Sequence, residues 1–147
     1  MNFEEFKKIV EEAKSKHPFW FDSESDPKAD NDQIKQASEA LGVNLPEDYI
    51  DFVKEYGGGY FAFTNIFSVY SNSDDWYIVE RNFEYNLPEN NFIAISDDEA
   101  GGYYGFRVKD GICDSSIAYW DHESHDPIMD RQYDNLFSFI AEIGLKN

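Results

Sequence analysis

Histidines and carboxylates that could bind a metal ion are crowded into residues 121–126, whose sequence is DHESHD. His122 and His125 stand three residues apart. The zinc-protease motif instead places its histidines four apart on a helix, with a glutamate after the first. Pro127 follows directly and favours a loop. We therefore interpret the segment as a solvated polar loop, with a zinc site as the alternative.

A second acidic run, Asp97, Asp98 and Glu99, comes shortly before Gly101 and Gly102. Carboxylate oxygens are ligands that magnesium prefers, so the run is a candidate magnesium site. Acidic residues beside paired glycines are also typical of a turn. We predict a turn here.

The sequence shows no recognisable nucleophile. Cys113 and the serines lack the elbow motif of hydrolases. Gly57–Gly59 lack the lysine and hydroxyl residue that complete a phosphate loop. We therefore predict a protein that is not an enzyme, with no catalytic residue, no metal ligand and no cofactor. A metal-dependent hydrolase centred on residues 97–99 and 121–126 is an alternative.

The charge of the chain narrows the choice of partner. Its 147 residues include 30 Asp and Glu against 12 Lys and Arg, which gives a net charge of −18. This charge repels nucleic acid and anionic lipid, and it attracts a cationic protein. Residues 70–134 contain 15 acids and four bases, whereas residues 1–20 are balanced. General solubility does not require this asymmetry, so we predict a protein partner, no nucleic acid and no membrane.

Three groups combine aromatic rings with carboxylates, a composition that tight protein interfaces use. We predict that they bind the partner. They are Asp74, Asp75, Trp76 and Tyr77; then Asp97, Asp98, Glu99 and Tyr103, followed by Tyr104; and then Asp121, Glu123 and Asp126, beside Trp120. The alternative for Trp76 and Tyr104 is a place in the core, and for Trp120 we expect the core.

Periodicity predicts the elements that position these groups. Four helices are expected. They cover residues 3–16, the segment from the capping box at Asp30 and Gln33 to the stop at Gly42, residues 46–56 beginning at Pro46, and residues 136–143. Two segments are expected to be loops, residues 22–32 and residues 121–134. Strands are expected within residues 60–70 and at 92–96, 103–108 and 117–120. For residues 76–80 two alternatives remain open, a helix capped by Ser73 or a strand.

The order of helices, then strands, then a helix predicts an α+β fold. We expect one domain over residues 1–147, with a mostly antiparallel sheet and helices packed on one side. Cys113 is the only cysteine, and the N-terminal segment lacks the apolar core of a signal peptide. These features predict a cytoplasmic protein.

Across residues 30–143, the chain resembles the SUKH superfamily, which includes yeast cell-wall assembly regulators and many bacterial immunity proteins. The pattern begins with a helix that ends in Leu-Gly, followed by Leu-Pro, a helix with aromatic residues and a Gly-Gly pair. Next come an apolar strand, an acidic residue, a second Gly-Gly pair and an aromatic strand. A later strand that ends in Trp-Asp and a final apolar helix complete the pattern. The matching residues are Leu41, Gly42, Leu45, Pro46, Asp48, Tyr49, Phe52, Tyr56, Gly57, Gly58, Phe92, Ile93, Ile95, Asp97, Gly101, Gly102, Tyr104, Phe106, Trp120, Asp121, Leu136, Phe139 and Ile140. Residues 1–29, a helix and an acidic loop, lie outside the pattern.

The resemblance implies an immunity protein, an antitoxin that binds and neutralises a cognate polymorphic toxin. Many such toxins are nucleases, whose sites are basic because they bind a polyanion, and an acidic inhibitor suits such a site. A regulatory adaptor like the yeast proteins is the alternative. Most signature residues also have roles in folding, since glycines end helices and aromatic residues fill the core.

Overall fold

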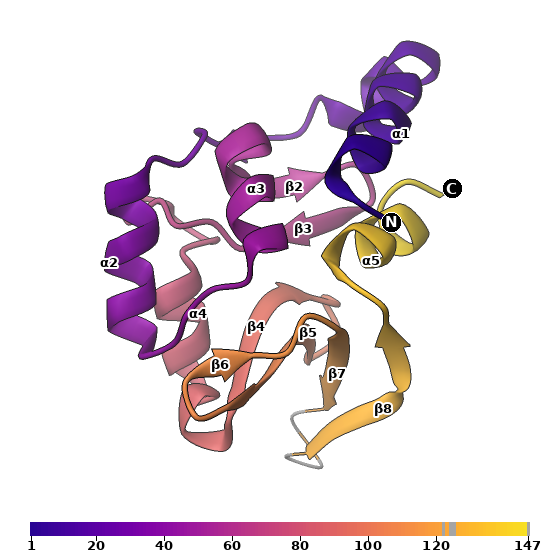
Figure 1. Cartoon of the computed structure of the whole chain (residues 1–147). Coiled ribbons are helices and arrows are strands. Elements are labelled where there is room, and N and C mark those ends of the chain that lie inside the picture. The colour runs from indigo at the N-terminus through magenta and orange to yellow at the C-terminus, as the bar shows by residue number, and fades with distance from the viewer. Residues whose placement is uncertain (122, 124–125, 147) are drawn as a thin grey trace.

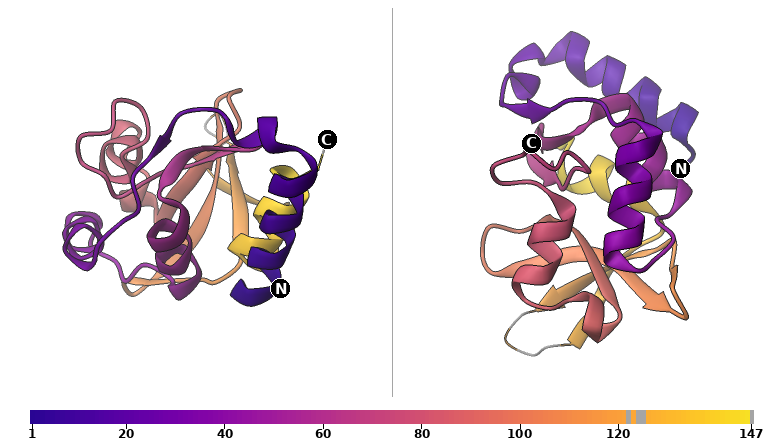
Figure 2. Two further views of the ribbon diagram at one scale, coloured as in Figure 1. Left: turned by 90° about the horizontal axis from the view of Figure 1, so that it is seen from above. Right: turned by 90° about the vertical axis from the view of Figure 1, so that its left-hand side faces the viewer.

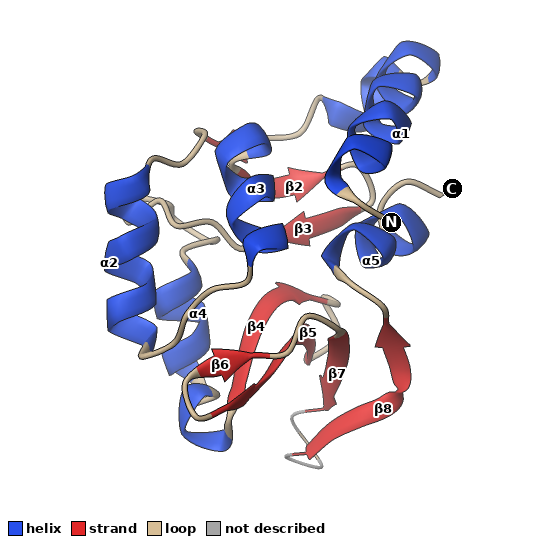
Figure 3. Cartoon of the chain, in the orientation of Figure 1, coloured by secondary structure: helices blue, strands red, loops and turns tan. Residues whose placement is uncertain are grey.

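The computed structural model describes residues 1–121, 123 and 126–146. Strands β4 to β8 lie below α1, α3 and α5, whereas β2 and β3 lie between α3 on one side and α1 and α5 on the other (Figures 1 and 3). The two views of Figure 2 show α2 beside α4, and α1 beside α5. The helices are α1 (Phe3–Lys16), η1 (Pro18–Phe21), α2 (Asn31–Leu41), α3 (Glu47–Tyr56), α4 (Ile78–Glu84), η2 (Pro88–Asn90) and α5 (Leu136–Ile143).

The strands form two antiparallel sheets, a small one in the order β1-β2-β3 and a larger one in the order β4-β5-β7-β8, with β6 on β5. A backbone hydrogen bond from Phe67 N to Ile95 O, 2.8 Å long, joins the two sheets. The fold is therefore α+β and antiparallel as predicted, but its strands are divided between two sheets. The strands are β1 (Ser25–Asp26), β2 (Gly58–Phe61), β3 (Thr64–Ile66), β4 (Phe92–Asp97), β5 (Gly102–Lys109), β6 (Ile112–Cys113), β7 (Ile117–Asp121) and β8 (Asp126–Tyr133).

The core is aromatic, as the composition predicts. Phe6 of α1 stacks on Phe137 of α5, with ring centroids 5.0 Å apart, and also packs on Phe52 and Phe61. Such ring pairs contribute about 1 kcal/mol each beyond their buried area. Helix α1 is therefore part of the fold, although it lies outside the family pattern.

Three local predictions are wrong. Residues 22–32 are predicted to be a loop, yet β1 (Ser25–Asp26) lies within them and pairs with β2. The polar composition of residues 121–134 predicts a loop, yet β8 pairs with β7 and places Ile128 opposite Tyr119. Ser73 does not cap a helix at 76–80. Its hydroxyl accepts a hydrogen bond from Trp76 N (3.1 Å), and α4 begins only at Ile78. Of the two alternatives for residues 76–80, the helix forms, but only from Ile78 onward. A smaller difference is that Pro46 is the residue before α3 and not its first residue.

Gly42 ends α2 in the left-handed conformation, with φ at 72°. Changing Gly42 to alanine should cost about 1 kcal/mol of unfolding free energy, because a Cβ is strained there although open space surrounds it. Urea denaturation measures this loss. Gly42→Asn should lose less, since asparagine tolerates this conformation, and an equal loss in both variants would contradict the explanation.

Candidate protein-binding surface

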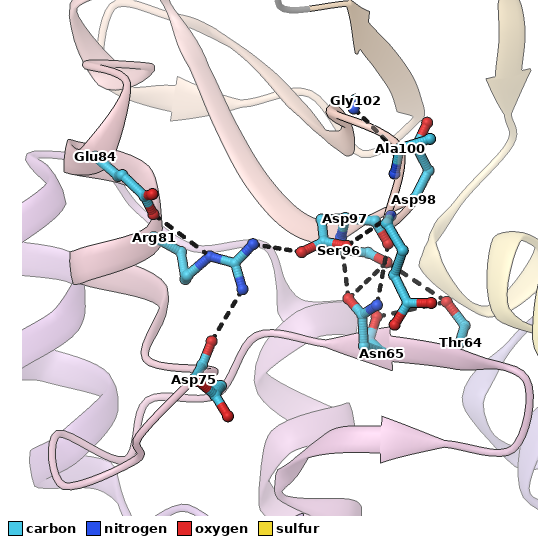
Figure 4. Close-up of polar contacts among 11 residues, drawn as sticks. Thr64, Asn65, Asp75, Arg81, Glu84, Ser96, Asp97, Asp98, Ala100 and Gly102 are labelled. Carbon is cyan, nitrogen blue, oxygen red and sulfur yellow. Dashed lines mark hydrogen bonds and ion pairs between the residues drawn. The ribbon is translucent and has the colours of Figure 1, made fainter.

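Arg81 of α4 joins two of the predicted aromatic and acidic groups (Figure 4). Its Nη2 forms an ion pair with the carboxylate of Asp97 at the end of β4. Its Nη1 donates a 2.9 Å hydrogen bond to the backbone oxygen of Asp75, in the loop before α4. Its Nε lies 3.9 Å from the carboxylate of Glu84. One guanidinium therefore fixes the loop, the helix and the strand relative to one another.

Aromatic rings complete the surroundings of this guanidinium. Its Cζ lies 4.6 Å from the ring centroid of Phe67 and 5.9 Å from that of Trp76, distances at which rings attract cations. Burial opposes the charge, but hydrogen bonding and charge interactions with Asp97 and Tyr103 outweigh it and raise the pKa of Arg81. Arg81 is therefore charged at every physiological pH.

Strand β3 holds the end of β4 through Asn65, a buried amide. Asn65 Nδ2 donates to the backbone oxygen of Asp97 (3.0 Å), and Asn65 Oδ1 accepts from Asp97 N (3.0 Å) and from the hydroxyl of Ser96 (3.2 Å). These side-chain bonds connect β3 directly to the last two residues of β4. They position the β4–β5 turn against the small sheet.

The carboxylate of Asp98 organises the β4–β5 turn. It accepts hydrogen bonds from Ala100 N and Gly102 N, both 2.8 Å long, and from the hydroxyl of Tyr119 (2.5 Å). The predicted turn therefore forms, but it begins after Asp97, which is the last residue of β4. Asp97 and Asp98 each serve the fold.

The predicted residues differ in how accessible they are. Asp74, Asp75, Glu99 and Glu123 are exposed, whereas Tyr103 is buried, with 5% of its surface accessible. Trp76, Tyr77, Asp98 and Asp121 are half-buried, and the side chain of Asp97 is 16% accessible. Contact between any of them and a partner remains a prediction. Trp120, expected in the core, is buried at 2%.

Exposed aromatic rings adjoin these acids. Tyr60 of β2 packs edge-on against Trp76, with centroids 5.0 Å apart. Phe63, in the β2–β3 turn, is 49% accessible and Tyr60 is 43% accessible. Their rigid rings offer contact area at low entropic cost.

Three shallow hollows lie along this side of the molecule, and they share residues or contacts. Asp74 and Asp75 line both a hollow of about 220 Å³ with Glu24 and a hollow of about 340 Å³ with Glu80 and Glu84. The third contains Tyr60, which packs on Trp76 of the first. We call this continuous surface the aromatic–acidic face. It consists of Glu24, Tyr60, Phe63, Asp74, Asp75, Trp76, Tyr77, Glu80, Glu84 and Glu99.

The third predicted group lies at the same end of the larger sheet as the β4–β5 turn. Asp121 is opposite Gly102 in the pairing of β7 with β5, and its carboxylate accepts a hydrogen bond from Glu123 N (3.0 Å). The side chain of Asp126 is outside the described part of the chain. His122 and His125, the alternative zinc ligands, also lie outside it.

The sequence does not single out six residues of this site: Glu24, Tyr60, Phe63, Glu80, Arg81 and Glu84. They come from four separate segments, so no spacing connects them. Arg81 carries the one usable signal, because it is the only base between residues 70 and 106. A lone base among many acids is a candidate for an internal ion pair.

Among the described residues, no group of three or more His, Cys, Asp or Glu is placed to hold a metal ion. None of the helices in the described ranges has the length and apolar character needed to cross a membrane.

Cys113 should react slowly with alkylating agents. The thiol is half-buried, and burial raises its pKa to about 12, so little thiolate exists at pH 8. We expect alkylation by iodoacetamide to be at least about tenfold slower in the folded protein than in urea. Equal rates would show that the thiol is a usable nucleophile and would revive an enzymatic explanation.

Comparison with known proteins agrees with this architecture. A crystal structure of a protein from Pseudomonas syringae pv. tomato matches with a TM-score of 0.70, over 96% of this chain and 99% of that chain. Its sequence identity is 15%, so the match shows the fold alone. No similar sequence is found among the curated proteins.

A family model describes the same region from sequence. The SUKH_6 model, described as SMI1-KNR4 cell-wall, matches residues 31–140, from the first residue of α2 into α5. The matched region contains every strand except β1, as well as Arg81 and most of the aromatic–acidic face. The chain therefore belongs to the SUKH family of SMI1-KNR4 cell-wall proteins.

Proposed function

We propose that the protein is a cytoplasmic immunity protein that neutralises a cognate polymorphic toxin by stoichiometric binding, with the aromatic–acidic face as its contact. The observation that carries the proposal is the continuity of this face, in which exposed rings and carboxylates from four segments adjoin one another. Family membership supports it, since the SUKH family includes immunity proteins. Aromatic anchors surrounded by charge are typical of tight interfaces.

The charge of the face favours a basic toxin, such as a nuclease. Among the described residues, Arg81 is the one base that lines the three hollows, and its charge is paired with Asp97. The acids of the face therefore act together on an approaching partner. A nuclease site must be positive to bind its substrate, so the face would attract it and block it.

The experiment is co-expression of this protein with the toxin domain encoded beside its gene. Growth should be rescued by the wild-type protein, and a catalytically inactive toxin should co-purify with it at one copy each. The Trp76→Ser variant, which changes the face, should no longer rescue growth. Its matched control, Ile112→Ser, changes an exposed residue of β6 and should still rescue growth.

The second candidate function is an adaptor that scaffolds other cytoplasmic proteins. The description of the matching family, SMI1-KNR4 cell-wall, favours this candidate because it refers to cell-wall proteins and not to toxin inhibitors. A gene without a toxin gene beside it, together with no rescue and no complex, would favour the adaptor. It would also contradict the proposed neutralisation.

A further inference from the structure

One hollow of the face, of about 320 Å³, has walls of a different character from the others. It lies between the β2–β3 turn and the β4–β5 turn, and its apolar lining includes Tyr60, Phe63 and Ile143. Trp20 of η1 packs edge-on against Phe63, with centroids 4.9 Å apart. This contact holds the Phe63 ring in place while the residue remains 49% accessible.

Carboxylates form another part of the lining. Glu99 is exposed, and Asp98 beside it is half-buried. Glu99 N donates to the carboxylate of Asp97 (2.8 Å), which fixes the backbone of the turn. The described residues that line this hollow include no lysine, arginine or histidine. Anionic ligands are therefore repelled, and a cation is attracted.

Apolar walls beside carboxylates suit a side chain with an aliphatic stem and a charged head. The protein already stabilises a guanidinium in this way, since Arg81 lies over Phe67 and pairs with Asp97. The volume is near the lower limit for binding cavities, so it suits one side chain better than a larger ligand.

We propose that this hollow is a socket for an arginine or lysine side chain of the protein partner. The identity of the partner as a toxin rests on the proposed function, but binding of an arginine side chain in the socket can be tested without a toxin. It also gives the N-terminal segment, which lies outside the family match, a role in recognition, because Trp20 supports the socket wall.

The direct test is a titration of the whole protein with N-acetyl-arginine methylamide, followed by NMR of backbone amides. Signals of residues 62–65 and 98–100 should shift with saturation, at dissociation constants of about 1–10 mM, the range expected for one weakly held side chain. The citrulline counterpart, which has the same shape without the charge, should bind at least about tenfold more weakly. Equal shifts with both probes, or shifts located elsewhere, would overturn the socket.

Two variants separate the wall from the charge. Phe63→Ser and Glu99→Gln should each weaken arginine binding about fivefold. Their matched controls, Ile112→Ser and Glu89→Gln, change exposed residues outside the hollow and should bind as the wild type does. Because Glu99→Gln removes only a charge, it decides the question if Phe63→Ser folds poorly.

The two proposals fail in different ways. If the toxin binds Phe63→Ser and Glu99→Gln as tightly as it binds the wild type, the socket is overturned and neutralisation stands. If the wild type binds no toxin but the arginine probe binds as expected, the proposed function is contradicted and the socket stands.

Discussion

Arg81→Met should lower the free energy of unfolding by about 2–4 kcal/mol, one of the two largest effects we expect. Removing one partner of a mostly buried ion pair leaves an uncompensated charge, here that of Asp97, whose side chain is 16% accessible. The substitution also removes the hydrogen bond to Asp75 O and the contact with the Phe67 ring. Chemical denaturation followed by tryptophan fluorescence measures the loss.

A double-mutant cycle identifies the cause. Asp97→Asn in the Arg81→Met background removes the stranded charge and should recover part of the lost stability. Lys146→Met, which breaks the exposed pair with Glu142, is the control and should cost less than about 0.5 kcal/mol. If Arg81→Met costs no more than the control, Arg81 does not organise the site as described.

The second large effect concerns binding. Reversing Asp74 and Asp75 together to lysine should weaken the toxin complex about 100-fold at low ionic strength, mainly by slowing association. Both carboxylates are exposed and line two of the hollows, so the change alters the face without altering the core. Surface plasmon resonance measures the association and dissociation rates separately.

The control for this reversal carries the same change in net charge. Glu39 of α2 and Glu89 of η2 are both exposed and lie outside the face, and reversing them to lysine should slow association only slightly. Equal effects of the two double variants would mean that total charge matters and the position of the acids does not.

Local signals in the sequence predict much of the fold. The capping box at Asp30 and Gln33 forms with both expected hydrogen bonds, 2.8 and 3.0 Å long. Asp110 and Gly111 turn the β5–β6 hairpin with positive φ angles, as their residue types predict. These features depend on neighbouring residues, so the sequence contains them directly.

Features that depend on distant residues were not predictable in the same way. Strand β8 forms because its backbone pairs with β7. Its sequence around Pro127 lacks the alternation of apolar and polar residues that predicts a strand. Proline is tolerated there because β8 is at the edge of the sheet. The start of α4 depends on Ser68, which receives a hydrogen bond from Ile78 N and donates one to Trp76 O.

The candidate site shows the same division. The acids at 74–75 and 97–99 were found from composition, but their connection through Arg81 spans 16 residues and two elements. Composition also could not show that the carboxylates of Asp97 and Asp98 serve the fold, or that Tyr60 and Phe63 lie beside them. Exposure and contact require three dimensions.

The most direct test of the central proposal is isothermal titration of this protein with the purified, catalytically inactive toxin domain encoded beside its gene. We predict one-to-one binding in about 0.1 M salt that weakens at least tenfold in about 1 M salt, where the Debye length falls from about 10 Å to about 3 Å. Absence of binding at either salt concentration, or tight binding unaffected by salt and by the Asp74 and Asp75 reversal, would contradict it.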